Sequence, residues 1–492
     1  MQRLMTQNIN FPIVLRVIGW LLLIEGAYML LPLLVSLWFH EYDTVTVFAL
    51  SIAITLLAGV LMTFGLRPAD NSMRKREGII LTAVIWVFFS AFGMLPYLFS
   101  GTLSNVTDAF FETMSGFTTT GSTLITDVES LPHGIIFWRS STQWLGGMGI
   151  ILFTLAVLPM LNYKGGIALF NAEVTGITHE RIRPRVSQTA KDLWIIYITL
   201  SAIMAALLWQ PMGWFDAVCH TMATVSTGGY SSRNMGLQFW NSYYVYGVVM
   251  VFMFLGGMNF TLLYALTRGR LSLIRRNDTF KFYVTIIVLV SVIILFRMWD
   301  FNYFDNWTDR VTLAFFDTIA AATSTGFTSV RYETQGEFIA FIIMVLMVFG
   351  GMAGSTSGGA KIDRFLVMVK NSRNEFYRVL HSNAVTAVRI DGKAIPHQIV
   401  SKVIAFISIY LLVMVAVALI LAFLGLPMFD SLFTSVSVLS NFGFGYGVTA
   451  EPGSFIYLPT VAKWLLALEM LVGRLELFTV LILFTRRFWL KD

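Results

Sequence analysis

The sequence predicts an all-α polytopic membrane protein in which one helix–loop–helix unit occurs four times after an N-terminal pair of spans. Composition supports the first half of this prediction: 56% of the 492 residues are apolar, 13% are charged, and the mean hydropathy is +0.72. A soluble protein carries about 25% charged residues. Glycine-ended motifs that recur between the apolar runs support the second half.

Apolar runs long enough to cross a bilayer recur along the whole chain. Each approaches the roughly 20 residues that a spanning helix needs. The first run lacks a small-residue cleavage site, so we interpret it as a span and not as a removed signal peptide. The ten runs are approximately 17–37, 45–65, 78–100, 135–160, 193–209, 243–266, 281–297, 337–352, 399–424 and 460–485.

The basic residues predict the orientation of the chain. If the N-terminus is cytoplasmic and the spans alternate, most of the 34 Lys and Arg residues fall on the inner side. Basic residues concentrate in cytoplasmic loops, so this bias places both termini in the cytoplasm. A basic inner face needs no nucleic acid to explain it. The inner clusters are 67–76, 164–191, 268–281, 361–402 and 486–491.

Four short segments between the spans share a pattern. Residues 109–121 (AFFETMSGFTTTG) and 314–326 (AFFDTIAAATSTG) align without a gap over thirteen positions. Residues 215–230 and 429–444 fit the same frame more loosely, with Phe-Asp leading to STGG and SNFG. Each segment is too short to span a membrane and ends in small or hydroxyl residues and a glycine. Glu112 and Asp317 are expected either to hold the outer ends of their helices or to attract cations.

A second glycine motif follows each of these segments after roughly 25 to 30 residues, inside the next span. The motifs are LGGMG at 145–149, LGGMN at 255–259, FGGMAG at 349–354 and LVGRL at 471–475. Repetition of this kind indicates architecture better than any single motif does. The predicted unit is therefore span, half-crossing helix, glycine loop and span.

The physical chemistry of this unit favours a pore for cations. Non-helical backbone at membrane depth is tolerated only where protein buries it or where it lines a water-filled cavity. Glycine admits positive φ angles, so consecutive carbonyls can face one axis. Rings of carbonyl oxygens can replace the hydration shell of an ion, and the carboxyl ends of the half-crossing helices add partial negative charge.

These motifs resemble the Trk/Ktr/HKT superfamily of potassium transporters, and the extra N-terminal pair of spans is similar to the bacterial TrkH/TrkG branch. The resemblance covers essentially the whole chain. It implies potassium uptake in a bacterial inner membrane, with potassium as the substrate and no covalently bound cofactor. It also implies a homodimer and a separate cytosolic, nucleotide-binding regulator of the TrkA type.

The resemblance assigns a simplified selectivity filter to the four loops. The fourth loop departs from the pattern, with an Asn-Phe pair where the others carry hydroxyl residues. In plant relatives a serine at the first filter glycine accompanies sodium transport, so glycine in all four loops favours potassium. The assigned glycines are Gly121, Gly228, Gly326 and Gly443. The assigned carbonyl residues are Thr119, Thr120, Ser226, Thr227, Ser324, Thr325, Asn441 and Phe442.

A glycine-rich run predicts a break in the third inner helix. Residues 350–360 contain five glycines, each costing roughly 1 kcal/mol against alanine in a helix. A helix–helix contact through small residues is one alternative; the hydroxyl residues and the terminal lysine favour a loop that lines a cavity. The resemblance implies a gate beneath the filter. Its candidate residues are Gly350, Gly351, Gly354, Ser355, Thr356, Ser357, Gly358, Gly359 and Lys361.

Arg474 lies deep in the last span. Charges inside a membrane are rare, usually partnered and usually functional. Its helical neighbours three and four residues away, Met470, Leu471, Leu477 and Phe478, include no acid. The resemblance implies a positive barrier on the pore axis, coupled to the gate loop. A buried salt bridge to another repeat remains the alternative.

The motifs of rival classes are missing. The chain has no His-Glu-x-x-His, no Gly-x-Ser-x-Gly and no phosphate loop ending in Gly-Lys-Ser/Thr, so no enzyme is expected. Cys219 is the only cysteine, which excludes an intrachain disulfide. A potassium symporter coupled to protons or sodium stays open, although parallel repeats favour a channel-like pathway over the inverted repeats of many carriers.

The predicted organisation has five parts. Residues 1–76 form the N-terminal pair of spans. The four pore repeats are 77–189, 190–280, 281–397 and 398–492, and the third contains the intramembrane gate loop.

Overall fold

Helices dominate the computed structural model, which describes residues 9–66, 73–149, 186–299, 306–328, 335–381, 384 and 386–490. Two parts of the predictions lie outside these residues: the end of the span at 135–160 and most of the basic cluster at 164–191. The helices of the first half are α1 (Phe11–Tyr28), α2 (Leu30–Trp38), α3 (Tyr42–Gly65), α4 (Lys75–Gly93), α5 (Leu95–Phe99), α6 (Val106–Phe117), α7 (His133–Gly147), α10 (Val186–Met212) and α11 (Trp214–Val225). Those of the second half are α12 (Tyr243–Gly256), α13 (Phe260–Thr267), α14 (Leu271–Arg276), α15 (Asp278–Trp299), α16 (Trp307–Ala322), α18 (Glu337–Phe349), α19 (Ile362–Leu380), α20 (His397–Phe423), α21 (Met428–Leu439), α22 (Thr460–Arg474), α23 (Leu477–Leu481) and α24 (Arg486–Trp489).

Six stretches of helix in the described residues are long and apolar enough to cross a membrane, judged by length and composition. The pair α12 and α13, bent by 109°, makes a seventh if it is taken as one span. This confirms a multi-pass helical membrane protein. The six are Phe11–Trp38, Tyr42–Gly65, Arg76–Phe99, Ala190–Met212, Asp278–Met298 and His397–Phe423.

The remaining predicted spans are shorter than expected. Helix α18 has 13 residues and α22 has 15, so each helix is shorter than the run predicted at 337–352 or 460–485. Helix α7 has 15 residues and ends at Gly147, while α12 ends at Gly256 before its sharp bend. The physical reason is the same each time, because the helix stops at a glycine motif where helix propensity is low.

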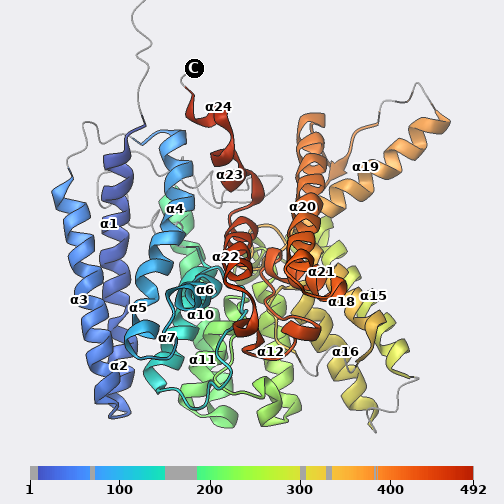
Figure 1. Ribbon diagram of the computed structural model, residues 1–492. Coiled ribbons are helices and arrows are strands. Elements are labelled where there is room, and N and C mark those ends of the chain that lie inside the picture. Colours follow the sequence, from blue (N-terminus) through green and yellow to red (C-terminus); the bar gives the residue numbers. More distant parts are fainter. Residues whose placement is uncertain are drawn as a thin grey trace, which may run out of the picture.

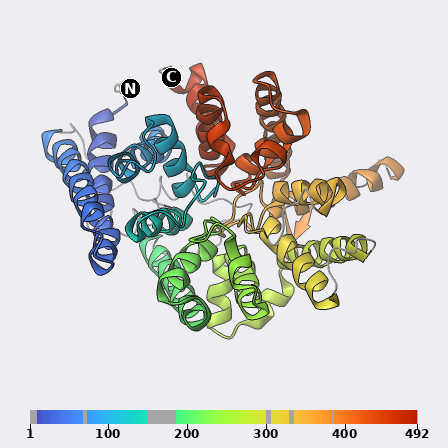
Figure 2. The same ribbon diagram turned by 60° about the horizontal axis from the view of Figure 1, so that its bottom comes forward.

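The segments that follow the N-terminal helices are arranged around a common centre. In Figure 2 the teal, green, yellow-to-orange and red parts of the chain succeed one another around the middle of the molecule. The blue helices α1 and α3 pack against each other outside the teal part (Figures 1 and 2). Chain order is therefore also the order around the centre.

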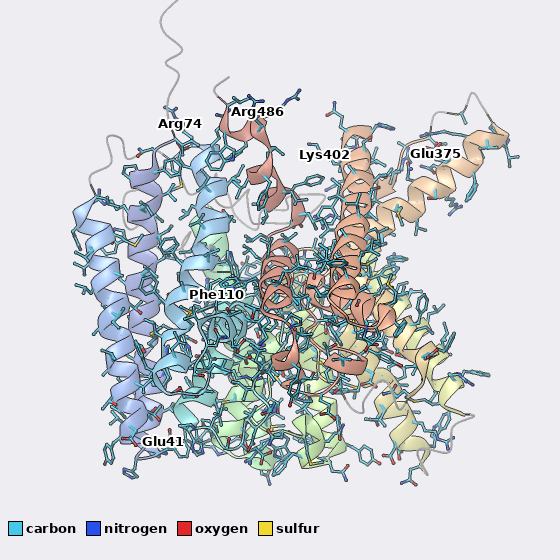
Figure 3. The ribbon with its side chains drawn as sticks, viewed as in Figure 1. Glu41, Arg74, Phe110, Glu375, Lys402 and Arg486 are labelled. Carbon is cyan, nitrogen blue, oxygen red and sulfur yellow. The ribbon has the colours of Figure 1, made fainter. Side chains whose placement is uncertain are left out.

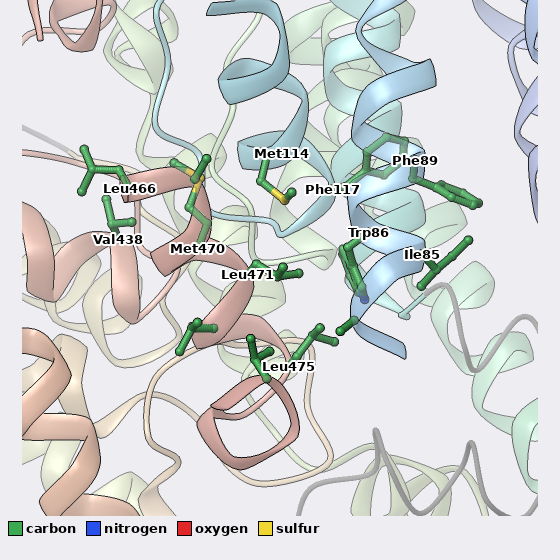
Figure 4. Close-up of a cluster of buried hydrophobic side chains, with 14 of the residues drawn as sticks. Ile85, Trp86, Phe89, Met114, Phe117, Val438, Leu466, Met470, Leu471 and Leu475 are labelled. Carbon is green, nitrogen blue, oxygen red and sulfur yellow. The ribbon is translucent and has the colours of Figure 1, made fainter. Parts of the chain in front are cut away.

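Apolar side chains fill the space between neighbouring parts of this arrangement. Helix α6 packs against both α4 and α22, so the first and last parts of the ring are in contact. Figure 4 shows the buried cluster at this junction, to which α4, α6 and α22 contribute. Its members include Trp86, Phe89, Met114, Phe117, Met470 and Leu471.

Two features depart from a purely bundled shape. Helix α19 projects from one end of the molecule (Figure 1). Later in the chain comes a small antiparallel hairpin of β1 (Arg389–Ile390) and β2 (Lys393–Ala394), which an all-α prediction did not include; it lies against α19, where Lys370 Nζ donates to Arg389 O. Arg74, Lys402 and Arg486 lie at this same end, and Glu41 lies at the opposite end (Figure 3).

Candidate functional site

The four short helices α6, α11, α16 and α21 end with the same backbone geometry. Two residues beyond each helix the chain takes a positive φ of 52–56°, and the next N–H bonds the carbonyl five residues back. This is the Schellman ending of a helix, where glycine is the usual left-handed residue. Here the left-handed residues are Thr119, Thr227, Ser324 and Asn441. The bonds are Thr120 to Ser115 (2.9 Å), Gly228 to Ala223 (2.8 Å), Thr325 to Ala320 (2.9 Å) and Phe442 to Ser437 (2.8 Å).

The left-handed residues carry strain. Thr119 and Thr227 are β-branched, and a β-branched residue at positive φ is sterically unfavourable. Such conformations persist where the surrounding structure over-determines them, and they cluster at functional sites. The four helix ends therefore hold a left-handed backbone geometry that lowers local stability.

A glycine at positive φ follows two residues later in each loop, and these glycines close a ring. A Cβ placed on any of them would overlap the backbone carbonyl oxygen of the next loop. The glycines are Gly121, Gly229, Gly326 and Gly443, with φ of 87°, 76°, 80° and 87°. Such a Cβ would lie 2.3 Å from Gly228 O, 2.0 Å from Thr325 O, 2.0 Å from Phe442 O and 1.9 Å from Thr120 O, in that order. The first loop thus contacts the second, the second the third, the third the fourth, and the fourth the first. We call these four loops the carbonyl ring.

The predicted register is wrong in the second loop. Helix α11 ends at Val225, so Gly229 occupies the position of Gly121, and Gly228 occupies the carbonyl position of Thr120. Ser226 then matches Thr118, one residue before the left-handed position. Two consecutive glycines fit either frame in the sequence, and only the helix end distinguishes them. The fourth loop keeps its predicted frame, because Asn441, Phe442 and Gly443 match the first loop residue for residue.

A cavity of about 310 Å³ adjoins the ring. All four glycines of the ring line it, together with Arg233 and Glu451. The oxygen atoms that meet at the ring belong to the backbone. Among the described residues no group of three or more His, Cys, Asp or Glu is placed to hold a metal ion. Backbone carbonyls of this kind suit a dehydrated monovalent cation.

A buried ion pair braces the first loop against the second. Glu112 is fully buried and accepts hydrogen bonds from Leu124 N (2.8 Å) and from Arg139 Nε (2.9 Å). Arg139 also donates to Ser231 O (2.9 Å) and lies over the ring of Tyr230, 3.7 Å from its centroid. These bonds join the middle of α6 to the loop that follows it and to α7, which is not the expected role of holding the outer end of the helix. No pattern in the sequence indicated that Arg139 would be buried with Glu112.

The glycine-rich run is a loop, as its composition predicted. Helix α18 ends at Phe349, and non-helical chain continues to Lys361 before α19 begins. Thr356 Oγ1 donates to Val225 O (3.1 Å), and Gly358 N donates to Ser324 Oγ (2.5 Å). A Cβ on Gly358 would lie 2.0 Å from Ser440 O. The loop therefore lies against the carboxyl ends of α11, α16 and α21.

The loop is held by its own polar groups and by the short connection between α12 and α13. Gly350, Gly354 and Gly359 take positive φ angles of 64°, 75° and 75°. Gly351 N bonds Ser357 Oγ, Ser355 Oγ bonds Ser357 Oγ, and Lys361 Nζ donates to Ser357 O. Met352 N bonds Gly257 O (2.9 Å) and Asn259 Nδ2 bonds Ala353 O (2.6 Å).

Arg474 joins this loop to the end of another helix. The guanidinium group donates to Thr356 O (2.7 Å), Gly146 O (2.8 Å) and Gly147 O (3.0 Å). It thus connects α22, the loop and the last turn of α7. Glu476, two residues along the chain, pairs with Arg364 at 2.5 Å.

A multi-pass helical fold and a ring of backbone carbonyls define an integral membrane transport protein. The family TrkH, described as cation transport protein, matches residues 44–490. The chain belongs to this family, which confirms the family predicted from the loop motifs.

Relatives and one solved structure match over nearly the full length. The Trk system potassium uptake protein TrkH of Escherichia coli K12 is 34% identical over 484 residues, covering 98% of this chain and 99% of the relative. TrkG of the same organism is 32% identical over 482 residues, covering 97% and 98%. The crystal structure of the potassium transporter TrkH from Vibrio parahaemolyticus covers 98% of this chain and 100% of its own, with 32% identity and a TM-score of 0.88. These relatives are transporters and not enzymes.

Proposed function

We propose that this protein mediates potassium uptake across a bacterial inner membrane, with the carbonyl ring as its selectivity filter. The observation that carries the proposal is the ring itself, in which Gly121, Gly229, Gly326 and Gly443 leave room for no side chain between neighbouring loops. The names of the relatives, potassium uptake proteins, support the same substrate.

The chemistry of the ring suits a cation that is stripped of water. Carbonyl dipoles at close quarters replace the hydration shell of potassium. The carboxyl ends of α6, α11, α16 and α21 meet there, and each contributes partial negative charge. No side-chain carboxylate needs to bind the ion.

The loop at 350–361 is the proposed gate, and Arg474 its positive barrier. The support is positional: the loop contacts the ends of three of the four short helices, and Arg474 bonds its Thr356 carbonyl. Ions leaving the ring past these helix ends meet the loop and the guanidinium group. Lys361 is buried at the end of the loop, where its Nζ donates to Ser357 O.

The proposed orientation in the membrane and the proposed partners are supported by the charges and by the family. Arg74, Lys402 and Arg486 at one end of the molecule support a cytoplasmic location for that end and for both termini (Figure 3). We propose a homodimer controlled by a cytosolic nucleotide-binding protein of the TrkA type. The proposed parts of the chain remain 1–76 for the N-terminal pair and 77–189, 190–280, 281–397 and 398–492 for the repeats.

Ion flux into liposomes tests the proposal. Purified protein is expected to carry potassium and rubidium and to discriminate against sodium, with a reversal potential set by the potassium gradient alone. A reversal potential that shifts with pH or sodium would favour the coupled symporter instead. Absence of potassium flux in folded protein would reject the proposed function.

Shortening the gate loop tests the gate. Deleting residues 355–357 removes the bonds from Thr356 to Val225 O and from Arg474 to Thr356 O. Basal potassium flux without a cytosolic partner is therefore expected to rise. The matched control is Ser408→Ala on α20, which removes only an exposed bond to a carbonyl of its own helix. Lost flux in a deletion variant that remains folded would mean that the loop is packing and not a gate.

A further inference from the structure

A buried side chain of α7 makes two hydrogen bonds to the second loop of the carbonyl ring. Gln143 of α7 is fully buried, and its Nε2 donates to Gly228 O at 2.6 Å. Its Oε1 accepts from Tyr230 N at 3.1 Å. The side-chain amide therefore binds the chain on both sides of Gly229. Gly228 O is also the oxygen that contacts Gly121 in the ring.

The same contact explains the double glycine of the second loop. A Cβ on Gly228 would lie 2.4 Å from Cδ of Gln143. The other loops carry Thr120, Thr325 and Phe442 at this position. A side chain at 228 would therefore displace the amide of Gln143 from its place against the second loop.

Gln143 is a polar exception among equivalent positions. The motifs LGG, LGG and FGG align Gly146, Gly256 and Gly350, and a shared contact, not the motif, aligns Gly473 of α22 with Gly146. A Cβ on Gly146 or Gly473 would lie 1.8 Å from Phe117 O or 2.1 Å from Leu439 O, which are matching last residues of α6 and α21. Three residues before these glycines stand Gln143, Met253, Met347 and Met470, all fully buried. Methionine has no N–H to donate to a carbonyl.

We propose that Gln143 is a specificity-determining residue, which weakens ion binding at one of the four oxygens of the carbonyl ring. This inference rests on the proposed function of the ring. An oxygen that accepts a short hydrogen bond faces the positive end of the donor, so it attracts a cation less. The bond also tethers Gly228 O toward α7. Gly228 O therefore binds an ion more weakly than it would without the bond from Gln143.

A weaker oxygen lowers the affinity of the carbonyl ring for the conducted ion. Conduction needs ion binding that is favourable enough for entry and weak enough for release. Gln143 thus lowers the affinity of the ring for the ion through its bond to Gly228 O. A side chain that cannot donate should let Gly228 O bind the ion as the other three oxygens do.

Gln143→Met, which places the residue of the three equivalent positions here, tests the inference by concentration-dependent rubidium and sodium flux. We expect the half-saturating rubidium concentration to fall about three- to tenfold, the change that one neutral hydrogen bond produces. The preference for rubidium over sodium should rise with it. Met253→Leu on α12 is the matched control and should leave both quantities unchanged. Wild-type half-saturation and selectivity in folded Gln143→Met, beside a conducting wild type, would overturn the inference.

The wild-type protein provides a second test that does not depend on folding of the variant. In a crystal grown in rubidium, the anomalous peak at the ring should lie farther from Gly228 O than from the oxygens of Thr120, Thr325 and Phe442. Equal distances would overturn the role of Gln143 and leave the filter in place. Absence of any peak at the ring would instead reject the proposed function, and the inference with it.

Discussion

Gly326→Ser is expected to abolish most of the discrimination between potassium and sodium. A side chain at this position must adopt a φ of 80°, and its Cβ would lie 2.0 Å from Phe442 O. The left-handed backbone alone costs roughly 1–2 kcal/mol for an L-residue, and the overlap forces the neighbouring carbonyl to move. One 1.4 kcal/mol change is about a tenfold change in an equilibrium. The ratio of potassium to sodium flux in liposomes is therefore expected to fall about tenfold or more.

The chain offers a matched control for this substitution. Gly247 on α12 has open space around its Cα, and its φ lies outside the left-handed region. Gly247→Ser should leave the flux ratio unchanged. Gly121→Ser should behave like Gly326→Ser, because its Cβ would also meet a carbonyl of the next loop. Unchanged selectivity in folded Gly121→Ser and Gly326→Ser would reject the filter assignment.

Arg474→Ala is expected to raise basal cation flux strongly. Two unit charges about 8 Å apart repel by roughly 2 kcal/mol at an effective dielectric constant near 20, which is a factor of about thirty in ion occupancy. The substitution also removes the bonds to Thr356, Gly146 and Gly147 that hold the loop beside α7. Both effects favour conduction. Potassium flux without a cytosolic partner, measured on reconstituted protein, checks the result.

Arg474→Lys separates the two effects. Lysine keeps the positive charge, but its single ammonium group lacks the planar fork that bonds the loop and α7 at once. A silent Lys variant beside a leaky Ala variant would show that charge is the barrier, whereas leakage in both would show that the bonds hold the gate. Some loss of thermal stability is expected in both, since hydrogen bonds from a charged group contribute about 1.5–3 kcal/mol. A large fall in melting temperature without any gain in flux would favour the buried salt bridge considered from the sequence.

Local patterns in the sequence predicted many of the helices and loops. Apolar runs located the helices, and the thirteen-position match of 109–121 with 314–326 located two of the loops. The glycines of 350–360 predicted the break after α18. These features depend on neighbouring residues, and neighbours are visible in a sequence.

Features that depend on distant contacts were missed. The frame of the second loop depends on where α11 ends, and Gly228-Gly229 fits two frames. Nothing in the sequence marks Arg139 as buried, yet it lies against Glu112. Lys463 is likewise buried and pairs with Asp108 at 2.6 Å. Gln143 stands out only in hindsight, as the one polar residue aligned with three methionines. Each of these residues acquires its role from a partner far along the chain.

The contact that completes the ring has a consequence for the making of the protein. Asn441 Nδ2 bonds Thr120 Oγ1, and Ser122 Oγ bonds Gly443 O, both across 321 residues of chain. Lys463 and Asp108, 355 residues apart, join the same two parts. A growing chain emerges with its N-terminal part first. The first loop therefore lacks its contacts with the fourth loop until nearly the whole polypeptide has been synthesised. A chain that terminates before residue 440 lacks the fourth loop, and no other loop can make these contacts.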